Sequence, residues 1–587
     1  MNKITYKIDD YIMYMRTYLK VPKTPNTYIR QIRLGQKASQ VQSKLTKYGY
    51  QITKSELSDL NDLRASLTVK PYLPDEDDKK IKSFNVYTED DKTITIPRFY
   101  GIHRYGQPTV RSFNGNMTKT AAKFTGKLRD NQVKIISTIK PRLIKEGGGM
   151  LVAGCGVGKT TMGLYIGIDI LETNILVLTH KTFLQDQWMK RAKEFTTAKV
   201  GIIRQNITPE KDCNIVIGMI QSICKRDYDP TIFDRFGLVI IDEAHHFASP
   251  IFSQGLFKCG SKYVLALTAT PKRADKLTRV LHWHVGDILY KQKRKANKQV
   301  LAKIFKYTSK SPLFKEKLRW SPQGMKVNNV GMINNLVEIQ TRNKHIINII
   351  NEVRKSPERK ILILSGRKSH LTYLKKEVDQ SITKDEELGV LVKGEIVTSY
   401  YMGGMKTYER QYAEENADIL FGTYDMAHEG LDIDRLNTII LATPKRNIIQ
   451  AIGRIMRRIL KFGDLRPLII DVVDQLSVFS DTSQGRARLY QYNEGKYKIE
   501  NYDISDNTQL DYEKILDINN LNVEDTNDLV PICADDDSDS ELENPFEDIK
   551  QEAKQDQPKK IKENKPYKPD KSDWKQKYKV NYDEFAF

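Results

Sequence analysis

The sequence predicts an α/β protein with two successive lobes, each built on a parallel β-sheet. Short apolar runs alternate with helix-length amphipathic stretches from about residue 120 to 290, and the alternation resumes from about 330 to 475. Such alternation is typical of βαβ units, whose strands pair in parallel. Residues 1–115 and 535–587 do not share the pattern. We therefore expect two tandem parallel-sheet lobes between a small N-terminal α+β region and a charged, disordered C-terminal tail.

The expected elements follow from the same pattern. Residues 83–99, SFNVYTEDDKTITIPRF, predict a hairpin with its turn at residues 89–92. In the first lobe (120–290) the expected strands are MLVAG, ILVLTH, IVIGM, LVIID and YVLALT. In the second lobe (331–480) they are ILILSG, GEIVTSYY, ADILFGT, TIILAT and PLIIDVV.

Three further segments have their own character. Residues 291–330 are basic and poorly periodic, which favours a linker or insertion between the lobes. Residues 481–534 are assigned to a C-terminal extension. Residues 535–587 join an acidic block, DDDSDSELENPFED, to a lysine-rich stretch with few apolar residues. This composition predicts disorder.

Charge and composition narrow the function. The formal net charge of +21 favours a polyanionic partner, although lysine-rich surfaces also aid solubility and charge alone does not separate the two. No apolar run is long enough for a transmembrane helix, and the charged N-terminus lacks a signal peptide's apolar core. The 5 cysteines are scattered without a CxxC pair, which argues against a zinc knuckle or a disulfide framework.

A glycine-rich loop in the first lobe predicts a phosphate-binding site. AGCGVGKT lies between the apolar run MLV and a helix-like stretch, which is the context that a P-loop requires. Its glycines let backbone N–H groups wrap a phosphate; Lys159 is expected to reach the β- and γ-phosphates, and the Thr160 hydroxyl to bind Mg²⁺. The predicted ATP-binding residues of the loop are Ala153, Gly154, Cys155, Gly156, Val157, Gly158, Lys159 and Thr160. Ala153 stands where the strict pattern has glycine, and a small residue fits there.

A pair of carboxylates follows about eighty residues later. In LVIIDEAHH, Asp242 and Glu243 come at the carboxyl end of a buried strand, where open α/β sheets bind ligands. We expect Asp242 to hold Mg²⁺ through its water shell and Glu243 to orient and deprotonate the attacking water. A lone acidic pair would more simply be solvated at a helix N-terminus. The P-loop upstream favours the catalytic interpretation.

The box Asp242-Glu243-Ala244-His245, together with the P-loop, resembles the superfamily 2 helicases, whose two lobes are RecA-like. The resemblance covers about residues 120–475 and implies roles for other segments. Gln132 in LRDNQ would contact adenine, and Thr179 in THKTFLQDQW would contact nucleic acid, as would the segment IVIGMIQSI. The three residues that would couple hydrolysis to lobe movement are Thr268, Ala269 and Thr270.

The second lobe supplies the remaining motifs. FGTYDMAHEGLDI resembles a helicase motif in which Thr423 would touch a nucleic-acid phosphate and Gly430 and Asp432 would lie near the nucleotide. In QAIGRIMRR, residues 450, 454 and 457 are spaced i, i+4, i+7 and share one helix face. A solvated basic face is the simpler interpretation of this pattern alone. Beside the other motifs, Arg454 and Arg457 are predicted arginine fingers.

The finer resemblance is to viral enzymes. LTATPKRADKLTRVLHWHVGDI resembles the XPB-type branch, and YMGGMK, ATPKRNIIQAIGRIMR and LIIDVVD are more similar to helicases of large cytoplasmic DNA viruses, including the poxvirus transcript-release helicase. The segments LTVKP and IPRFYG also look like this viral group. The resemblance implies an ATP- and Mg²⁺-dependent motor with 3′→5′ polarity, acting in transcription termination, transcript release or repair.

The resemblance also predicts the partners and the location of the protein, and two alternative functions stay open. DNA or RNA is the expected partner, and the transcription machinery is the expected protein partner. No membrane partner is expected. A viral protein of this kind is expected in the host cytoplasm or the virion, and otherwise in the nucleus. A restriction or nuclease motor is one alternative; it would need an extra metal-binding carboxylate cluster. A nucleic-acid-binding ATPase that does not unwind is another.

Overall fold

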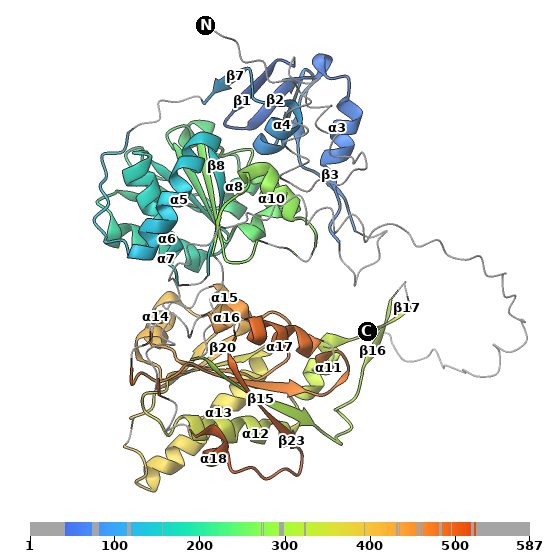
Figure 1. The fold of residues 1–587 in the computed structure, drawn as a ribbon, viewed down its shortest axis with the longest axis vertical. Coiled ribbons are helices and arrows are strands. Elements are labelled where there is room, and N and C mark those ends of the chain that lie inside the picture. The colour runs from blue at the N-terminus through green and yellow to red at the C-terminus, as the bar shows by residue number, and fades with distance from the viewer. Residues whose placement is uncertain are drawn as a thin grey trace, which may run out of the picture. The chain divides into compact units, whose positions relative to one another are not determined.

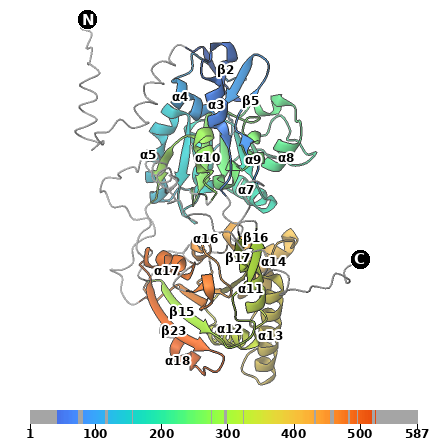
Figure 2. The same ribbon diagram turned by 90° about the vertical axis from the view of Figure 1, so that its right-hand side faces the viewer.

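The computed structural model describes residues 41–523, apart from 73–80, 114–118, 155, 272, 274, 293–298, 322–323, 393, 430–432, 434, 454, 456–459, 461, 481–483, 495 and 518–521. The chain divides into two units, residues 1–536 and 537–587. The predicted tail, residues 535–587, lies outside the described residues. Figures 1 and 2 show the small N-terminal domain and the two α/β lobes. No helix in the described ranges is long and apolar enough to cross a membrane.

The N-terminal domain is an α+β unit, as expected. Its five-stranded sheet has the order β5-β6-β2-β1-β7. The bounds are β1 Ser43–Thr46, β2 Gly49–Thr53, β5 Thr88–Glu89, β6 Thr93–Ile96 and β7 Val110–Ser112, with helices α3 Leu60–Leu67 and α4 Arg98–Tyr105 and a small ribbon of β3 Thr68–Val69 and β4 Phe84–Asn85. The expected hairpin is confirmed, because β5 and β6 pair antiparallel on either side of the predicted turn.

One buried arginine ties this domain to the first lobe. Arg98 is only 8% exposed, and its guanidinium donates to the backbone oxygens of Ser261 at 3.4 Å and Lys262 at 2.8 Å. Burial lowers its pKa to about 10. Phe99 and Phe113 lie beside the guanidinium. Arg98 stays charged at neutral pH, so these carbonyl contacts compensate part of its desolvation.

The first lobe contains a seven-stranded parallel sheet in the order β10-β11-β9-β12-β13-β8-β14. The strands are β8 Gly148–Val152, β9 Ile175–Thr179, β10 Val200–Ile203, β11 Ile215–Met219, β12 Leu238–Asp242, β13 Tyr263–Thr268 and β14 Ile288–Lys291. The helices are α5 Asp130–Glu146, α6 Lys159–Tyr165, α7 Thr182–Phe195, α8 Ile220–Lys225, α9 Pro250–Gly255 and α10 Thr278–Val285. The five predicted strands are all present.

Both faces of this sheet are buried, which explains why its strands are continuous apolar runs. Side chains alternate along each strand, so Val177 packs under α5, α6 and α7, while Leu176 and Leu178 pack under α8 and α10. Figure 1 shows these two helix layers on opposite sides of β8. Because the sheet is packed on both faces, the loops that follow its strands start from fixed positions at its carboxyl edge.

The second lobe repeats this plan with the strand order β19-β20-β18-β21-β22-β15-β23. The strands are β15 Leu301–Thr308, β18 Ile361–Ser365, β19 Thr398–Tyr401, β20 Ile419–Thr423, β21 Thr438–Leu441, β22 Leu468–Asp474 and β23 Lys498–Ser505. The helices are α11 Asn329–Leu336, α12 Gln340–Val353, α13 Lys368–Glu387, α14 Thr407–Asn416, α15 Tyr424–Glu429, α16 Ile449–Ile452, α17 Gln484–Glu494 and α18 Tyr512–Leu516. A separate hairpin joins β16 Leu318–Ser321 to β17 Gly324–Val327.

The expected boundaries of the second lobe need correction. The segment 291–330 was expected to be a linker or insertion, yet its residues 301–308 form β15, which pairs with β22 and β23 inside the sheet. The strand β23 comes from the expected C-terminal extension and completes the same sheet. Both segments therefore belong to the folded second lobe.

A buried ion pair crosses the interior of this lobe. Arg342 on α12 and Asp474 at the end of β22 are both fully buried, with Nε 2.6 Å from Oδ1 and Nη2 2.9 Å from Oδ2. The same guanidinium donates to the Ala442 oxygen at 2.9 Å. Removing one partner of such a pair leaves an uncompensated buried charge, so the pair fixes α12 against the strand ends.

Candidate active site

The glycine-rich loop connects β8 to α6 at the carboxyl edge of the first sheet. Gly156 and Gly158 have φ values of +81° and +83°, in the left-handed region that favours glycine. At Gly158 a Cβ atom would lie 2.1 Å from the Gln132 amide nitrogen. Lys159 Nζ donates to the backbone oxygens of Ala153 at 2.9 Å and Gly154 at 3.0 Å. The loop therefore folds around the lysine ammonium, and Cys155 lies outside the described residues.

Gln132 supports this loop from the first turn of α5. It is 3% exposed, and its amide Nε2 donates to the Val157 oxygen at 2.9 Å. Its Oε1 accepts the backbone N–H of Arg129 at 2.8 Å. Both ends of the amide thus contact the protein itself in this structure. The adenine contact expected from the sequence stays a prediction.

The carboxylate pair lies two strands away at the same edge. In the sheet register Val152 is opposite Thr268, and Leu267 is opposite Asp242, so the starts of the three loops form one row. Asp242 and Glu243 are 9% and 8% exposed. Glu243 has a φ of +45°, a left-handed conformation that costs of order 1–3 kcal/mol for such a residue and is common at functional sites.

Two donors fix the Asp242 carboxylate. The indole Nε1 of Trp188 donates to Oδ2 at 2.8 Å, and the backbone N–H of Glu243 donates to Oδ1 at 3.0 Å. Trp188 is 1% exposed and lies on α7. Sequence reasoning did not single out Trp188. Its place in the segment THKTFLQDQW gave no signal, because the contact joins residues 54 positions apart.

His245 lies between Glu243, the predicted general base, and the predicted coupling residues. Its Nδ1 lies 3.4 Å from Glu243 Oε2 and 3.2 Å from Thr268 Oγ1. The Thr268 hydroxyl also accepts the backbone N–H of Thr270 at 3.2 Å, across Ala269. A movement of the segment 268–270 would therefore displace the His245 ring and change its contact with Glu243.

The predicted nucleic-acid contact Thr179 is not at the surface. It is fully buried at the end of β9, and its hydroxyl donates to the Met219 sulfur at 3.6 Å. The prediction of a direct side-chain contact is therefore wrong for this structure, because β9 is a central strand in which every residue is buried. Thr182, the first residue of α7, is exposed a few residues further on.

In the second lobe, Thr423 ends β20 and is the register neighbour of Ser365 at the end of β18. His370 sits beneath this edge, with Nδ1 3.1 Å from Ser365 Oγ and Nε2 3.0 Å from Asn343 Oδ1. Burial lowers the pKa of His370 to about 3, so the ring is neutral near pH 7. The predicted site residues Gly430, Asp432, Arg454 and Arg457 lie outside the described residues.

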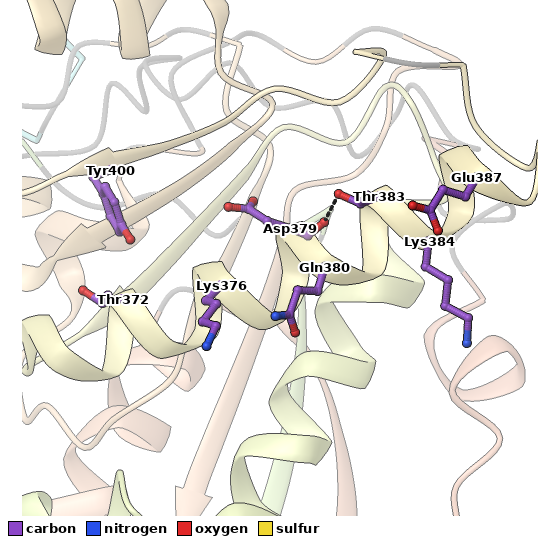
Figure 3. Close-up of a pocket in the computed structure, with 8 residues that line it drawn as sticks. All are labelled: Thr372, Lys376, Asp379, Gln380, Thr383, Lys384, Glu387 and Tyr400. Carbon is purple, nitrogen blue, oxygen red and sulfur yellow. Dashed lines mark hydrogen bonds between the residues drawn. The ribbon is translucent and has the colours of Figure 1, made fainter.

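A hollow of about 550 Å³ lies elsewhere, along α13 (Figure 3). Its lining alternates in charge, with Lys376 and Lys384 beside Asp379 and Glu387, and Tyr400 closes one end. None of the predicted site residues contributes to it. The mixed charge gives it no preference for an anion such as a nucleotide.

Together, the loop, the carboxylate pair and two parallel-sheet lobes define a two-lobed P-loop ATPase. Residues 125–273 match the family model of the type III restriction enzyme res subunit, and residues 341–458 match the helicase conserved C-terminal domain. A protein of Acanthamoeba polyphaga mimivirus, named as an ATP-dependent RNA helicase, is 35% identical over 488 residues, which are 81% of this chain and 90% of the relative. The chain belongs to the superfamily 2 helicases and is an ATP-dependent nucleic-acid helicase or translocase.

Two other relatives are named as a helicase and as a DNA translocase. A protein of Invertebrate iridescent virus 6, named as a helicase, is 27% identical over 64% of this chain and 84% of the relative. The DNA 3′–5′ translocase XPB2 of Sulfurisphaera tokodaii is 25% identical over 59% of this chain and 81% of the relative. Among solved structures, Saccharomyces cerevisiae Dbp5 bound to RNA and ADP BeF3 aligns with a TM-score of 0.42 at 12% identity, covering 67% of this chain and 97% of that one.

Proposed function

We propose that the chain is a viral 3′→5′ translocase that hydrolyses Mg²⁺-ATP to release transcripts or remodel nucleic acid, in the cytoplasm of the infected cell or in the virion. The observation that carries the proposal is the row of loop starts at Val152, Thr268 and Asp242. This row sets the phosphate loop, the coupling segment and the carboxylate pair side by side. The viral relatives, the first of which aligns over 90% of its length, support the proposed action in an infected cell or a virion.

The residues at this edge fit ATP and Mg²⁺. Lys159 Nζ lies within the glycine-rich loop, so it can exchange its carbonyl partners for β- and γ-phosphate oxygens. Thr160 and Asp242 offer the oxygen ligands that Mg²⁺ prefers. The described residues contain no group of three or more His, Cys, Asp or Glu side chains that could hold a metal. Mg²⁺ usually takes one or two protein oxygens plus substrate phosphates and water, so these two residues suffice.

Thr160 and Asp242 would hold Mg²⁺, which when bound would offset the negative charge of the ATP phosphates. Glu243 is the group that accepts a proton from the attacking water, because it is next to Asp242 and lies at the edge where the γ-phosphate would end. His245 Nδ1 lies 3.4 Å from this carboxylate and 3.2 Å from the Thr268 hydroxyl. The second-lobe residues Arg454 and Arg457 would meet the γ-phosphate when the lobes close.

Trp188 should tune the affinity for Mg²⁺. Trp188→Phe keeps the ring in its buried place but removes the N–H that fixes Asp242 Oδ2. Because outer-shell partners of metal ligands typically contribute 10- to 100-fold in affinity, we expect the Mg²⁺ concentration for half-maximal ATPase activity to rise by about 10-fold or more. Mg²⁺-dependent binding of a fluorescent ATP analogue provides a readout independent of turnover.

Trp283→Phe is the matched control, because it makes the same change in an indole that packs against Tyr100 of the N-terminal domain. This control should leave the Mg²⁺ dependence at the wild-type value. An unchanged Mg²⁺ dependence in Trp188→Phe, with a melting temperature like that of the wild type, would show that the indole N–H does not position Asp242.

For nucleic acid we propose that the exposed Thr182, rather than Thr179, contacts the strand in the first lobe, and that Thr423 contacts it in the second. Small hydroxyl donors at strand ends and helix starts suit phosphate contacts. The relatives' names divide between RNA helicase and DNA translocase, so both polymers must be tested.

Strand displacement tests the proposed motor directly. Labelled duplexes of DNA, RNA and DNA–RNA hybrid are prepared with either a 3′ or a 5′ single-stranded overhang. We expect ATP-dependent displacement only from the 3′ overhang. Displacement from the 5′ overhang alone would refute the polarity. ATP hydrolysis without displacement of any duplex would favour the non-unwinding ATPase.

A further inference from the structure

The hairpin β16–β17 forms a two-stranded sheet separate from the seven-stranded sheet of the second lobe. Figures 1 and 2 show it as a ribbon beside α11. Its register places Trp320 opposite Met325, Arg319 opposite Lys326 and Leu318 opposite Val327. It lies outside residues 125–273 and 341–458, the two ranges that match helicase family models. None of the sequence motifs assigned above accounts for it.

One face of the hairpin exposes large apolar side chains. Successive residues of a strand point to opposite faces, so Leu318, Trp320 and Met325 share one face. They are 50%, 76% and 61% exposed, respectively. An isolated two-stranded hairpin is at best marginally stable, and an exposed indole contributes little to folding. The exposed cluster therefore indicates contact with another molecule.

The other face of the hairpin is basic. Arg319 and Lys326 are directly opposed across the two strands. Arg319 is exposed and Lys326 is partly exposed, and both side chains carry a positive charge. The two faces together thus present an aromatic ring and a pair of cations within one short ribbon.

The hairpin is tied to the edge of the lobe that is expected to meet nucleic acid. Helix α11 begins at Asn329, directly after β17. Arg367 Nε donates to Asn334 Oδ1 at 2.6 Å, and its Nη2 donates to the Val330 oxygen at 3.1 Å, which holds α11. Arg367 follows Ser365, the register neighbour of Thr423. The chain of contacts therefore runs from the predicted phosphate contact to the base of the hairpin.

We propose that the β16–β17 hairpin binds single-stranded nucleic acid, with a base stacked on Trp320 and phosphates held by Arg319 and Lys326. Proteins bind single strands without sequence preference through aromatic side chains that stack on bases and cations that follow the phosphate backbone. Because Trp320 and the two cations lie on opposite faces of the ribbon, the strand would pass around an edge of the hairpin to contact both. The proposal rests on the proposed motor function and adds a contact in the second lobe. An acidic protein segment is the competing occupant, and it would use the cations without needing base stacking.

The test uses the full chain and labelled single-stranded DNA and RNA oligonucleotides, with binding measured by fluorescence anisotropy. Trp320→Ala should weaken binding by about 5- to 150-fold, since stacking on one aromatic side chain is worth about 1–3 kcal/mol per base. Trp320→Phe keeps an aromatic face and should restore most of the affinity. Tyr490→Ala removes another exposed aromatic side chain, 67% exposed on α17, and should bind like the wild type.

The cations are tested by salt dependence. For Arg319→Ala combined with Lys326→Ala, the slope of log affinity against log salt should fall by about 1.4, because two phosphate contacts on a single strand contribute about 0.7 each. The melting temperature of each variant verifies folding. Wild-type affinity in Trp320→Ala, or an equal loss in Tyr490→Ala, would overturn the proposal. A wild-type protein whose ATPase is insensitive to nucleic acid would instead refute the motor function on which it rests.

Discussion

Glu243→Gln is expected to lower the turnover number for ATP by about 10²- to 10⁴-fold while leaving ATP affinity close to that of the wild type. The amide keeps the size of the side chain and leaves Asp242, Thr160 and Lys159 to bind Mg²⁺-ATP, but it cannot accept a proton from water. Steady-state hydrolysis with saturating nucleic acid gives the turnover number, and equilibrium binding of a labelled ATP analogue gives the affinity.

Glu415→Gln makes the same chemical change at an exposed position of α14 and should hydrolyse ATP at the wild-type rate. Glu243 has a left-handed backbone, and glutamine, which has the same Cβ and side-chain length, meets the same steric demand there, so a loss of activity is expected to report on the carboxylate. Substantial turnover by Glu243→Gln would exclude this residue as the general base.

Arg454→Ala or Arg457→Ala should reduce turnover by about 10³- to 10⁵-fold, the range of an arginine finger, with a much smaller loss of ATP affinity. The reason is that their contacts with the γ-phosphate form mainly in the transition state, once the lobes have closed. Measurement of turnover and of nucleotide affinity on the same preparations separates the two effects.

Arg446→Ala provides a matched loss of charge nearby, because Arg446 is exposed just before α16. It should retain turnover. An ATP affinity that falls as steeply as turnover in Arg454→Ala or Arg457→Ala would mean that these side chains bind the ground state, and the assignment as arginine fingers would then be wrong.

Most of the strands predicted in the two lobes are buried on both faces, and the edge strand β19 is only partly buried. Runs such as LVIID and ILILS are apolar because helices cover each side of the sheet, and this pattern is visible without a structure. The strand β15 escaped prediction because Lys303 interrupts its apolar pattern. The structure buries this lysine, with Nζ 2.8 Å from Glu500 Oε2 and 2.6 Å from the Ile515 oxygen. Its partners come from about two hundred residues further along the chain, beyond the reach of local periodicity.

The candidate site likewise has parts that the sequence predicts and parts that only the structure shows. The glycine-rich loop and the carboxylate pair are contiguous motifs, so their spacing locates them in the sequence. The hydrogen bond from Trp188 to Asp242 and the burial of Thr179 depend on tertiary packing, which places an inward-facing strand residue and a helix residue against distant partners. The exposed hairpin at Trp320 was likewise hidden, because exposure is a property of the fold.

The most direct test of the central claim is the ATPase rate of the full chain without nucleic acid and with single- and double-stranded DNA and RNA, each at saturating concentration and with Lys159→Ala as the inactive reference. A motor that couples hydrolysis to nucleic acid predicts a rate that rises several-fold with at least one of these polymers and is abolished in Lys159→Ala. A wild-type rate that is the same with every polymer and without any would contradict the account.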